Sequence, residues 1–274
     1  MPSVIAAPSV RLTKHHGLGN DFLVLLDVDG RHRDLDRSRL ASRACDRHRG
    51  VGADGLLAAA AGSDGADITM SLYNADGSRA EMSGNGIRCL VQAVLDGGLV
   101  DGDRVVVATD AGPRQVECVD RPRPGLMSLR VDMGPAVLKG EDARWQTGKV
   151  QATALVDTGN PHLVLLDPTM ADIDIATEGR RIEEAFPEGI NVEWIFPGPG
   201  PDELTLRVWE RGAGATDACG TGSCAAATAA HSWGRVGSRV VVHNPGGDLI
   251  VDVGETAVLT GPAVFVATVD YPWH

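Results

Sequence analysis

Ser83-Gly-Asn-Gly-Ile-Arg-Cys89 is a glycine-rich stretch that returns, in altered form, as Cys219-Gly-Thr-Gly-Ser-Cys224. In each stretch a small nucleophilic side chain precedes Gly-x-Gly, and an apolar or alanine-rich run follows. The run predicts a helix, so the Gly-x-Gly backbone would lie at a helix N-terminus. Free N–H groups at that end, together with the positive end of the helix dipole, bind an anion such as a carboxylate.

The two stretches also indicate how a bound anion could be used chemically. We expect the helix dipole to lower the pKa of the Cys219 thiol toward the thiolate. Two such helices facing each other would hold one carboxylate and present a proton-transfer group to each side of its α-carbon. This arrangement suits inversion of a stereocentre.

Three further segments extend the set of motifs over nearly the whole chain: His16-Gly-Leu-Gly-Asn20-Asp-Phe, Gly159-Asn160-Pro-His162 and Leu259-Thr-Gly-Pro-Ala. In this order and separation, the motifs resemble those of the diaminopimelate epimerases. These enzymes are cofactor-independent amino-acid epimerases of lysine and peptidoglycan biosynthesis. The resemblance implies two pseudo-symmetric domains, each a β-sheet or barrel wrapped around a central helix, with the active site in the cleft between them. With the turn-forming Arg121-Pro-Arg-Pro-Gly125 as boundary, the domains would be residues 1–125, completed by a strand at about 264–274, and residues 126–263.

The bulk properties of the chain limit its function further. Its 274 residues suffice for one large domain or two medium ones. A net charge of -12 argues against nucleic acid or an anionic membrane as partner, because both need basic patches. No apolar run approaches the length of a membrane span, and the odd count of 5 cysteines favours a reducing cytoplasm. Relatives of this kind are commonly homodimers, so the resemblance also implies a homodimer.

Strand-like runs dominate the periodicity of the sequence and predict an α+β fold. Helical patterns are fewer, at residues 37–47, 88–96, 182–186 and 224–233. The predicted strands are Phe22–Leu26, Ile68–Tyr73, Arg104–Ala108, Leu126–Met133, Leu155–Val156, His162–Leu166, Leu204–Val208, Arg239–His243, Leu249–Val253 and Ala263–Val269.

Removal of an α-proton from an amino acid needs a cofactor, a metal or a well-placed base. A pyridoxal Schiff base would need a lysine, and none of Lys14, Lys139 and Lys149 is followed by a convincing phosphate site. Cys219 and Cys224 show no zinc-type spacing with histidines. We therefore expect no cofactor and no metal, and we expect acid–base chemistry by side chains.

Cys219 is the strongest catalytic candidate, because it directly precedes Gly-Thr-Gly at a helix start. The resemblance makes Cys219 and Ser83 the two α-carbon acid–base positions, and it adds Glu210 and His162 as catalytic residues. Arg211 would bind the distal carboxylate, since a guanidinium forks onto it, and Glu210 would face the distal ammonium. The remaining substrate-binding residues implied by the resemblance are Asn20, Asn74, Gly84, Asn85, Asn160, Asn191, Gly220 and Thr221.

Ser83 departs from the resemblance, since the family carries cysteine before both Gly-x-Gly segments. A hydroxyl is a far weaker acid and base than a thiol near neutral pH. Three explanations stay open: a deliberate replacement that gives an inert protein, natural divergence to a related reaction or loss of catalysis, and a native serine that relays a proton from another group. In each, Ser83 occupies the second proton-transfer position and epimerisation is impaired.

Two other functions compete with epimerisation of diaminopimelate. The first is that of a proline or hydroxyproline racemase-like enzyme, whose members tolerate Ser or Thr at one of these positions. The second is that of a catalytically silent diaminopimelate-binding protein. Arg211 and the set of asparagines favour a substrate with a second charged end, which proline lacks.

Overall fold

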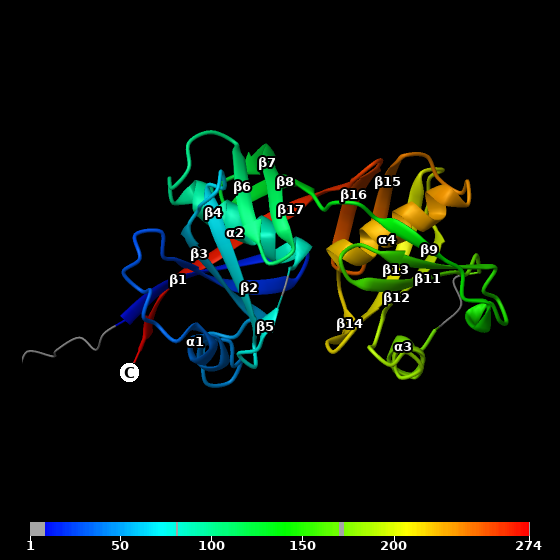
Figure 1. Cartoon of the computed structure of the whole chain (residues 1–274), viewed down its shortest axis with the longest axis horizontal. Coiled ribbons are helices and arrows are strands. Elements are labelled where there is room, and N and C mark those ends of the chain that lie inside the picture. Colours follow the sequence, from blue (N-terminus) through cyan, green and yellow to red (C-terminus); the bar gives the residue numbers. More distant parts are fainter. Residues whose placement is uncertain (1–8, 81, 170–172, 274) are drawn as a thin grey trace, which may run out of the picture.

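The computed structural model describes residues 9–80, 82–169 and 173–273 of the chain. Strands outnumber helices, and almost all of them join one continuous network of hydrogen bonds. Two lobes lie side by side, each with one buried helix among its strands (Figure 1). Within the described residues, no helix is long and apolar enough to cross a membrane. Because strands outnumber helices, the fold is of the mixed, strand-rich kind that the periodicity predicts.

The first lobe is a closed barrel, because each strand pairs with the next until the last pairs with the first. The short β5 (Arg79–Ala80) is added to β4. The barrel strands, in order around the ring, are β1 (Ser9–Gly17), β2 (Asn20–Leu26), β3 (Gly55–Ala61), β4 (Ile68–Asn74), β6 (Arg104–Thr109), β7 (Gly112–Arg123), β8 (Leu126–Asp132) and β17 (Ala257–Pro272).

Helix α2 (Gly84–Asp96) lies inside this barrel and packs against β1, β2, β3, β8 and β17 (Figure 1). Its residues from Gly84 to Val94 are all buried. Its apolar side chains are enclosed by the barrel, and its polar side chains Asn85, Arg88 and Gln92 make buried hydrogen bonds instead of contacts with water. Helix α1 (Arg37–Ala44) covers the outside of the barrel through Leu40 and its neighbours.

The second lobe is a curved sheet around helix α4 (Gly220–Ser232). The helix is rich in alanine, and its small side chains let the surrounding strands approach closely. Helix α3 (Ile175–Glu183) covers the outer face at β12, β13 and β14 (Gly214–Thr216). The paired strands are β9 (Val137–Gly140), β10 (Ala152–Asp157), β11 (Pro161–Leu166), β12 (Asn191–Pro197), β13 (Glu203–Glu210), β15 (Arg239–Asn244) and β16 (Gly247–Val253), and a single 3-10 turn spans Ala143–Trp145.

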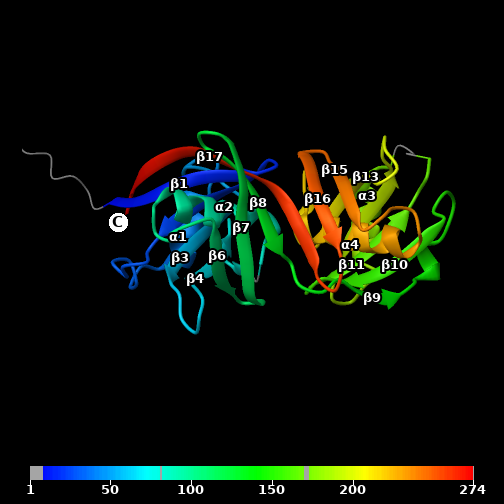
Figure 2. The same cartoon turned by 90° about the horizontal axis from the view of Figure 1, so that it is seen from above.

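Strand β17 links the two lobes, as the view from above shows (Figure 2). It begins paired with β16, continues against β8 and ends against β1. The hairpin of β7 and β8 turns at Gly125, so the predicted boundary at residues 125 and 126 falls inside the barrel. The last residue of β8 in the barrel is Asp132.

The structure differs from the predictions in several elements, and seven of its strands were not predicted: β1, β3, β5, β7, β9, β12 and β14. The helix predicted at residues 182–186 is α3, which begins at Ile175 after its N-cap Asp174 and ends at Glu183. The turn predicted at residues 121–125 lies at the end of β7, between this strand and β8. Strand β3 was missed because its sequence GLLAAAA lacks β-branched residues.

Candidate active site

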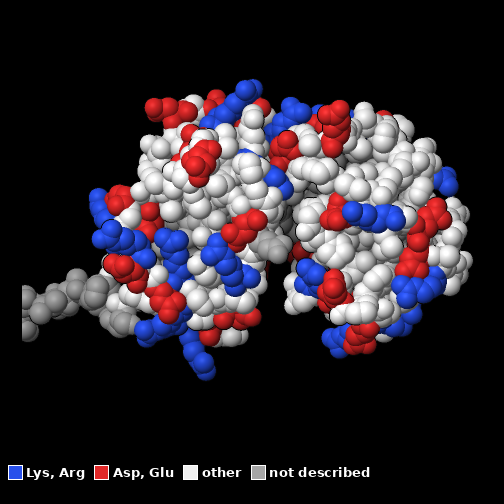
Figure 3. Space-filling view, in the orientation of Figure 1, with Lys and Arg blue, Asp and Glu red and all other residues white. Residues whose placement is uncertain are grey.

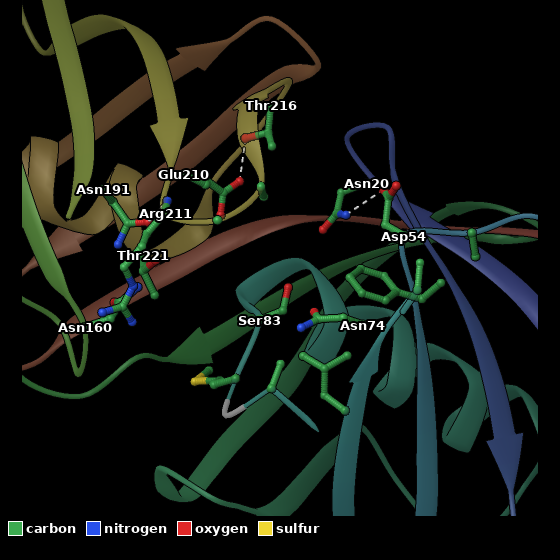
Figure 4. Close-up of a pocket in the computed structure, with 18 of the residues that line it drawn as sticks. Asn20, Asp54, Asn74, Ser83, Asn160, Asn191, Glu210, Arg211, Thr216 and Thr221 are labelled. Carbon is green, nitrogen blue, oxygen red and sulfur yellow. Dashed lines mark hydrogen bonds between the residues drawn. The ribbon is translucent and has the colours of Figure 1, made fainter. Parts of the chain in front are cut away.

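A cavity of about 1210 Å³ opens between the lobes and is lined by residues of both. The space-filling view shows the surface hollowed at this junction (Figure 3). In the close-up, residues of the barrel face residues of the second lobe across the cavity (Figure 4). The sequence-predicted residues that line the cavity are Asn20, Asn74, Ser83, Asn160, Asn191, Glu210, Arg211 and Thr221. The predicted Gly84, Asn85, His162, Cys219 and Gly220 lie behind this lining and are buried.

The first turns of α2 and α4 touch each other beside the cavity. A β-carbon added to Gly220 would lie 3.1 Å from the Cα of Gly84 and 3.1 Å from Cδ2 of Leu259. A β-carbon on Gly84 would lie 3.3 Å from the Cα of Gly220. Glycine is therefore needed at both helix starts, because the two backbones meet with no room for a side chain.

Ser83 and Cys219 cap these two helices in the same way. Ser83 has φ -136° and ψ 126°, and Cys219 has φ -121° and ψ 119°. Oγ of Ser83 accepts a hydrogen bond from the N–H of Gly86 at 3.0 Å, and Sγ of Cys219 accepts one from Gly222 at 3.3 Å. Each side chain thus uses one of the free N–H groups of its helix. The two positive helix ends come together at one place, as the motifs predict.

The prediction that the helix dipole lowers the pKa of Cys219 was wrong. Burial raises the pKa of this thiol well above its ordinary value, and the nearby carboxylates of Glu210 and Glu193 raise it further. The hydrogen bonds from Thr221 and Gly222 act in the opposite direction but are weaker causes. Cys219 is therefore held as the neutral thiol, and it needs a base close by before it can accept a proton.

A buried guanidinium fixes the start of α2. The side chain of Arg88 is fully buried and donates to the carbonyl oxygens of Gly84 at 2.9 Å and Pro262 at 3.2 Å, and to Oδ1 of Asn85 at 2.7 Å. Asn85 in turn donates to the carbonyl oxygen of Ala218 at 3.0 Å, directly before Cys219. Burial lowers the pKa of Arg88 to about 10, so the group stays charged at neutral pH. The chain of contacts ties the two helix starts together and brings a positive charge beside them.

Glu210 lies at the end of β13 and lines the cavity from the second lobe. The hydroxyl of Thr216 donates to Oε1 of Glu210 through a short hydrogen bond (Figure 4). The Arg211 backbone N–H donates to Oδ1 of Asn191 at 2.9 Å, and Nη1 of Arg211 donates to the Glu188 carbonyl oxygen at 3.2 Å. These contacts place a carboxylate, a guanidinium and an amide on one wall of the cavity.

The opposite wall carries a charged network that the sequence analysis missed. Nδ2 of Asn20 donates to Oδ2 of Asp54 at 2.8 Å (Figure 4). Nη2 of Arg47 donates to Asp54 at 2.7 Å and to Asp21 at 2.7 Å, and Nζ of Lys14 lies 2.8 Å from Asp21. The network orients the amide of Asn20 so that its oxygen is left for other donors, one of which is Nδ2 of Asn85 at 3.3 Å. Its members lie far apart in the chain, between residues 14 and 54, so no local pattern indicated the network.

His162 is fully buried and contacts two oxygen atoms. Its Nδ1 lies 2.7 Å from Oε1 of Glu193, and its Nε2 lies 2.9 Å from Oδ1 of Asn160. Thr158 also donates its hydroxyl to this Oδ1, at 3.0 Å. Burial raises the pKa of Glu193, and the histidine partly offsets this effect. Glu193 is a second residue that the sequence analysis missed.

Asn74 lines the cavity near Ser83 in the close-up, and its Nδ2 donates to Oγ of Ser78 at 2.9 Å (Figure 4). Among the described residues, no group of three or more His, Cys, Asp or Glu side chains is arranged to hold a metal ion. The arrangement offers instead a set of amide, hydroxyl and guanidinium donors, with carboxylates at both walls. The chemistry of this lining suits a small molecule that carries both charges.

Comparison with known proteins assigns the chain to a family. It is 40% identical to a diaminopimelate epimerase of Pelotomaculum thermopropionicum, over 97% of this chain and 100% of that protein. It is also 40% identical to a diaminopimelate epimerase of Desulfitobacterium hafniense, over 94% and 96%. A solved hydroxyproline epimerase from Agrobacterium vitis shares the fold, with a TM-score of 0.71 at 17% identity over 96% of this chain and 92% of that one.

A family description named diaminopimelate epimerase matches residues 12–139 and 154–266. Because this match covers most of the chain and the identity to two relatives is 40%, the chain belongs to the diaminopimelate epimerase family of isomerases.

Proposed function

We propose that this protein interconverts L,L- and meso-diaminopimelate by transferring protons on opposite faces of the α-carbon, without a cofactor, in lysine and peptidoglycan biosynthesis. The family membership supports the substrate. The observation that carries the mechanism is the contact of two helix starts, each capped by a side chain in the same conformation. Two positive helix ends at one place suit a single carboxylate.

The proposed roles follow from where each group lies. Free backbone N–H groups of the two Gly-x-Gly segments bind the reacting carboxylate. Cys219 and Ser83 take the two faces of the α-carbon, and Glu210 is the base that the neutral Cys219 thiol needs. Arg211 binds the distal carboxylate from the wall on which it lies.

Ser83 limits the reaction in this proposal. A hydroxyl gives up and takes up protons far less readily than a thiol, so one of the two steps is slow. Ser83→Cys should raise turnover by about 10²-fold or more, which is the usual contribution of a positioned acid or base. Ser232→Cys is the matched control, because Ser232 lies at the far end of α4 and is exposed.

The test combines calorimetric titration of diaminopimelate with measurement of α-proton exchange and inversion in deuterated water. Binding with slow inversion that speeds up in Ser83→Cys supports the proposal. Binding without any exchange in either form would mean a silent diaminopimelate-binding protein. Exchange of the α-proton of proline, without exchange of that of diaminopimelate, would mean a proline or hydroxyproline racemase-like enzyme. An unchanged rate in Ser83→Cys would remove Ser83 from the mechanism.

We also propose two pseudo-symmetric domains with the site between them. One is the barrel of residues 9–132 with most of β17, and the other is the sheet around α4. The first prediction of residues 1–125 and 126–263 becomes, in this proposal, a boundary after Asp132. We also propose that the protein is cytoplasmic and forms a homodimer. Sedimentation at several protein concentrations tests the dimer.

A further inference from the structure

Glu193 reaches His162 because the strands that carry them are parallel neighbours. In the pairing of β11 with β12, His162 lies opposite Asn191. Side chains alternate along a strand, so Glu193, two residues after Asn191, projects from the same face as His162. Both side chains are fully buried, and Nδ1 and Oε1 are 2.7 Å apart.

Glu193 also borders the start of α4. A β-carbon on Gly222 would lie 2.7 Å from Oε1 of Glu193 and 3.3 Å from Sγ of Cys219. Glycine at position 222 therefore leaves the space that the carboxyl group occupies beside the catalytic helix start. The other oxygen, Oε2, is buried and has no hydrogen-bond partner among the residues that the structure describes.

The contacts of His162 fix how many protons the pair holds. Nε2 faces Oδ1 of Asn160, an amide oxygen that only accepts, so Nε2 carries a hydrogen. If Nδ1 also carries one, the imidazole is a cation beside a Glu193 carboxylate. If Nδ1 is bare, Glu193 must be protonated to make the contact at 2.7 Å. Both forms hold one proton more than a neutral imidazole and a carboxylate, and both have zero net charge.

Burial favours the state in which the pair holds this extra proton, called the loaded state below. Loss of the proton would leave a single negative charge in a site without water contact, which is costly unless the charge is paired. Besides His162, the Glu210 carboxylate disfavours a negative charge on Glu193, whereas the positive start of α4 beside Gly222 favours one. The α4 start makes no hydrogen bond to Oε2, which stays without a partner among the described residues. The burial that raises the pKa of Glu193 agrees with retention of the proton.

We propose that Glu193 is a positioning residue that shares this proton with His162 and keeps a hydrogen on Nε2 ready for the substrate cavity. Asn160 lines the cavity and covers Nε2, so a rotation of its side chain exposes that hydrogen. When Nε2 gives its hydrogen to a base in the cavity, the shared proton passes to Nδ1. The imidazole is then neutral, Glu193 is a carboxylate, and the reverse transfer reloads the pair.

This inference rests on the proposed function for its role in turnover, because the pair would supply the proton that Ser83 cannot hold well. In the third explanation of Ser83, the hydroxyl relays a proton from another group. The pair of His162 and Glu193 would be that group. The resting state of the pair, however, does not depend on any substrate.

Glu193→Gln is the central test, because the amide has nearly the same shape as the carboxyl group. Its NH2 can donate to a bare Nδ1 and keep the hydrogen on Nε2, but it cannot pass a proton to Nδ1. We expect kcat to fall about 10²-fold with KM changed less than about threefold, and Glu193→Asp to restore part of the loss. Glu203→Gln is the matched control: Glu203 lies 3.1 Å from Nε2 of the partly exposed His243, far from the cavity lining, and should leave kcat unchanged.

Nitrogen-15 NMR of histidine-labelled protein without substrate provides the second readout, with His162 assigned by its loss in His162→Gln. We expect a hydrogen on Nε2 at neutral pH and a proton shared between Nδ1 and the carboxyl group, which Glu193→Gln reduces to a bare Nδ1. A bare Nε2 in the native protein, or full turnover in Glu193→Gln, would overturn the proposal. A loaded pair in a protein that never inverts diaminopimelate would leave the pair standing and refute the proposed function.

Discussion

Gly220→Ala tests whether the two helix starts must touch. The new methyl group would lie 3.1 Å from the Cα of Gly84 and 3.1 Å from Cδ2 of Leu259. Ordinary carbon contacts begin at roughly 3.5 Å, so the two starts have to separate by about 0.4 Å. The Cα of Gly84 is backbone and cannot rotate away. Overpacking of this kind costs about 1–3 kcal/mol of the free energy of unfolding.

The same displacement should reach the site, because the N–H groups of both helices move with their first turns. A shift of about 1 Å costs about 10²-fold in rate, so we expect turnover to fall between about 5-fold and 50-fold. The melting temperature should fall by roughly 2–12 °C. Thermal unfolding and α-proton exchange measure the two effects. Gly254→Ala is the control, because a β-carbon there would have its nearest neighbour at 3.6 Å. Unchanged turnover in Gly220→Ala would refute the shared anion site.

Three further changes test the surrounding structure. Asn85→Leu removes the acceptor of the buried Arg88 guanidinium, and urea unfolding should show a loss of about 2–3 kcal/mol. Burial raises the pKa of Cys45 to about 12 from an ordinary 9.0, so above pH 9 only the unfolded chain loses this proton, and stability falls as the pH rises. Cys45→Ala should remove about 1.4 kcal/mol per pH unit of that decline, seen in unfolding curves taken between pH 9 and 11. Thr216→Val takes the hydroxyl from Glu210, and kcat should fall about tenfold while the melting temperature stays within a few degrees.

The local sequence pattern was enough to locate the two helix starts on which the site is built. The first glycines of α2 and α4 are informative because a helix start that meets another backbone disfavours any side chain at that position. Ser83 and Cys219 could be placed as caps for the same reason. The first two turns of helix α3 were missed because Gly179 lies within them. A β-carbon at this position would come 2.4 Å from Cγ of Trp209, so the residue serves a packing contact with a distant strand.

Long-range contacts explain what the sequence could not show. The raised pKa of Cys219 depends on burial and on carboxylates that come from β12 and β13. Glu193 is one acidic residue in an apolar strand, and only the pairing of β11 with β12 brings it to His162. Arg88 lies inside a helix whose pattern is apolar, and nothing nearby in sequence predicts that carbonyl oxygens hold its charge.

Strand β17 sets the order in which this molecule can assemble in a cell. The barrel closes only when β17 inserts between β1 and β8, and β17 follows every other barrel strand in the chain. At typical rates of translation, β1 emerges on the order of ten to fifty seconds earlier. During that time β1 and β8 lack their shared neighbour, and an unpaired strand edge invites pairing with other chains. Nascent chains of this protein should therefore be open to chaperone binding at these edges until β17 has emerged from the ribosome.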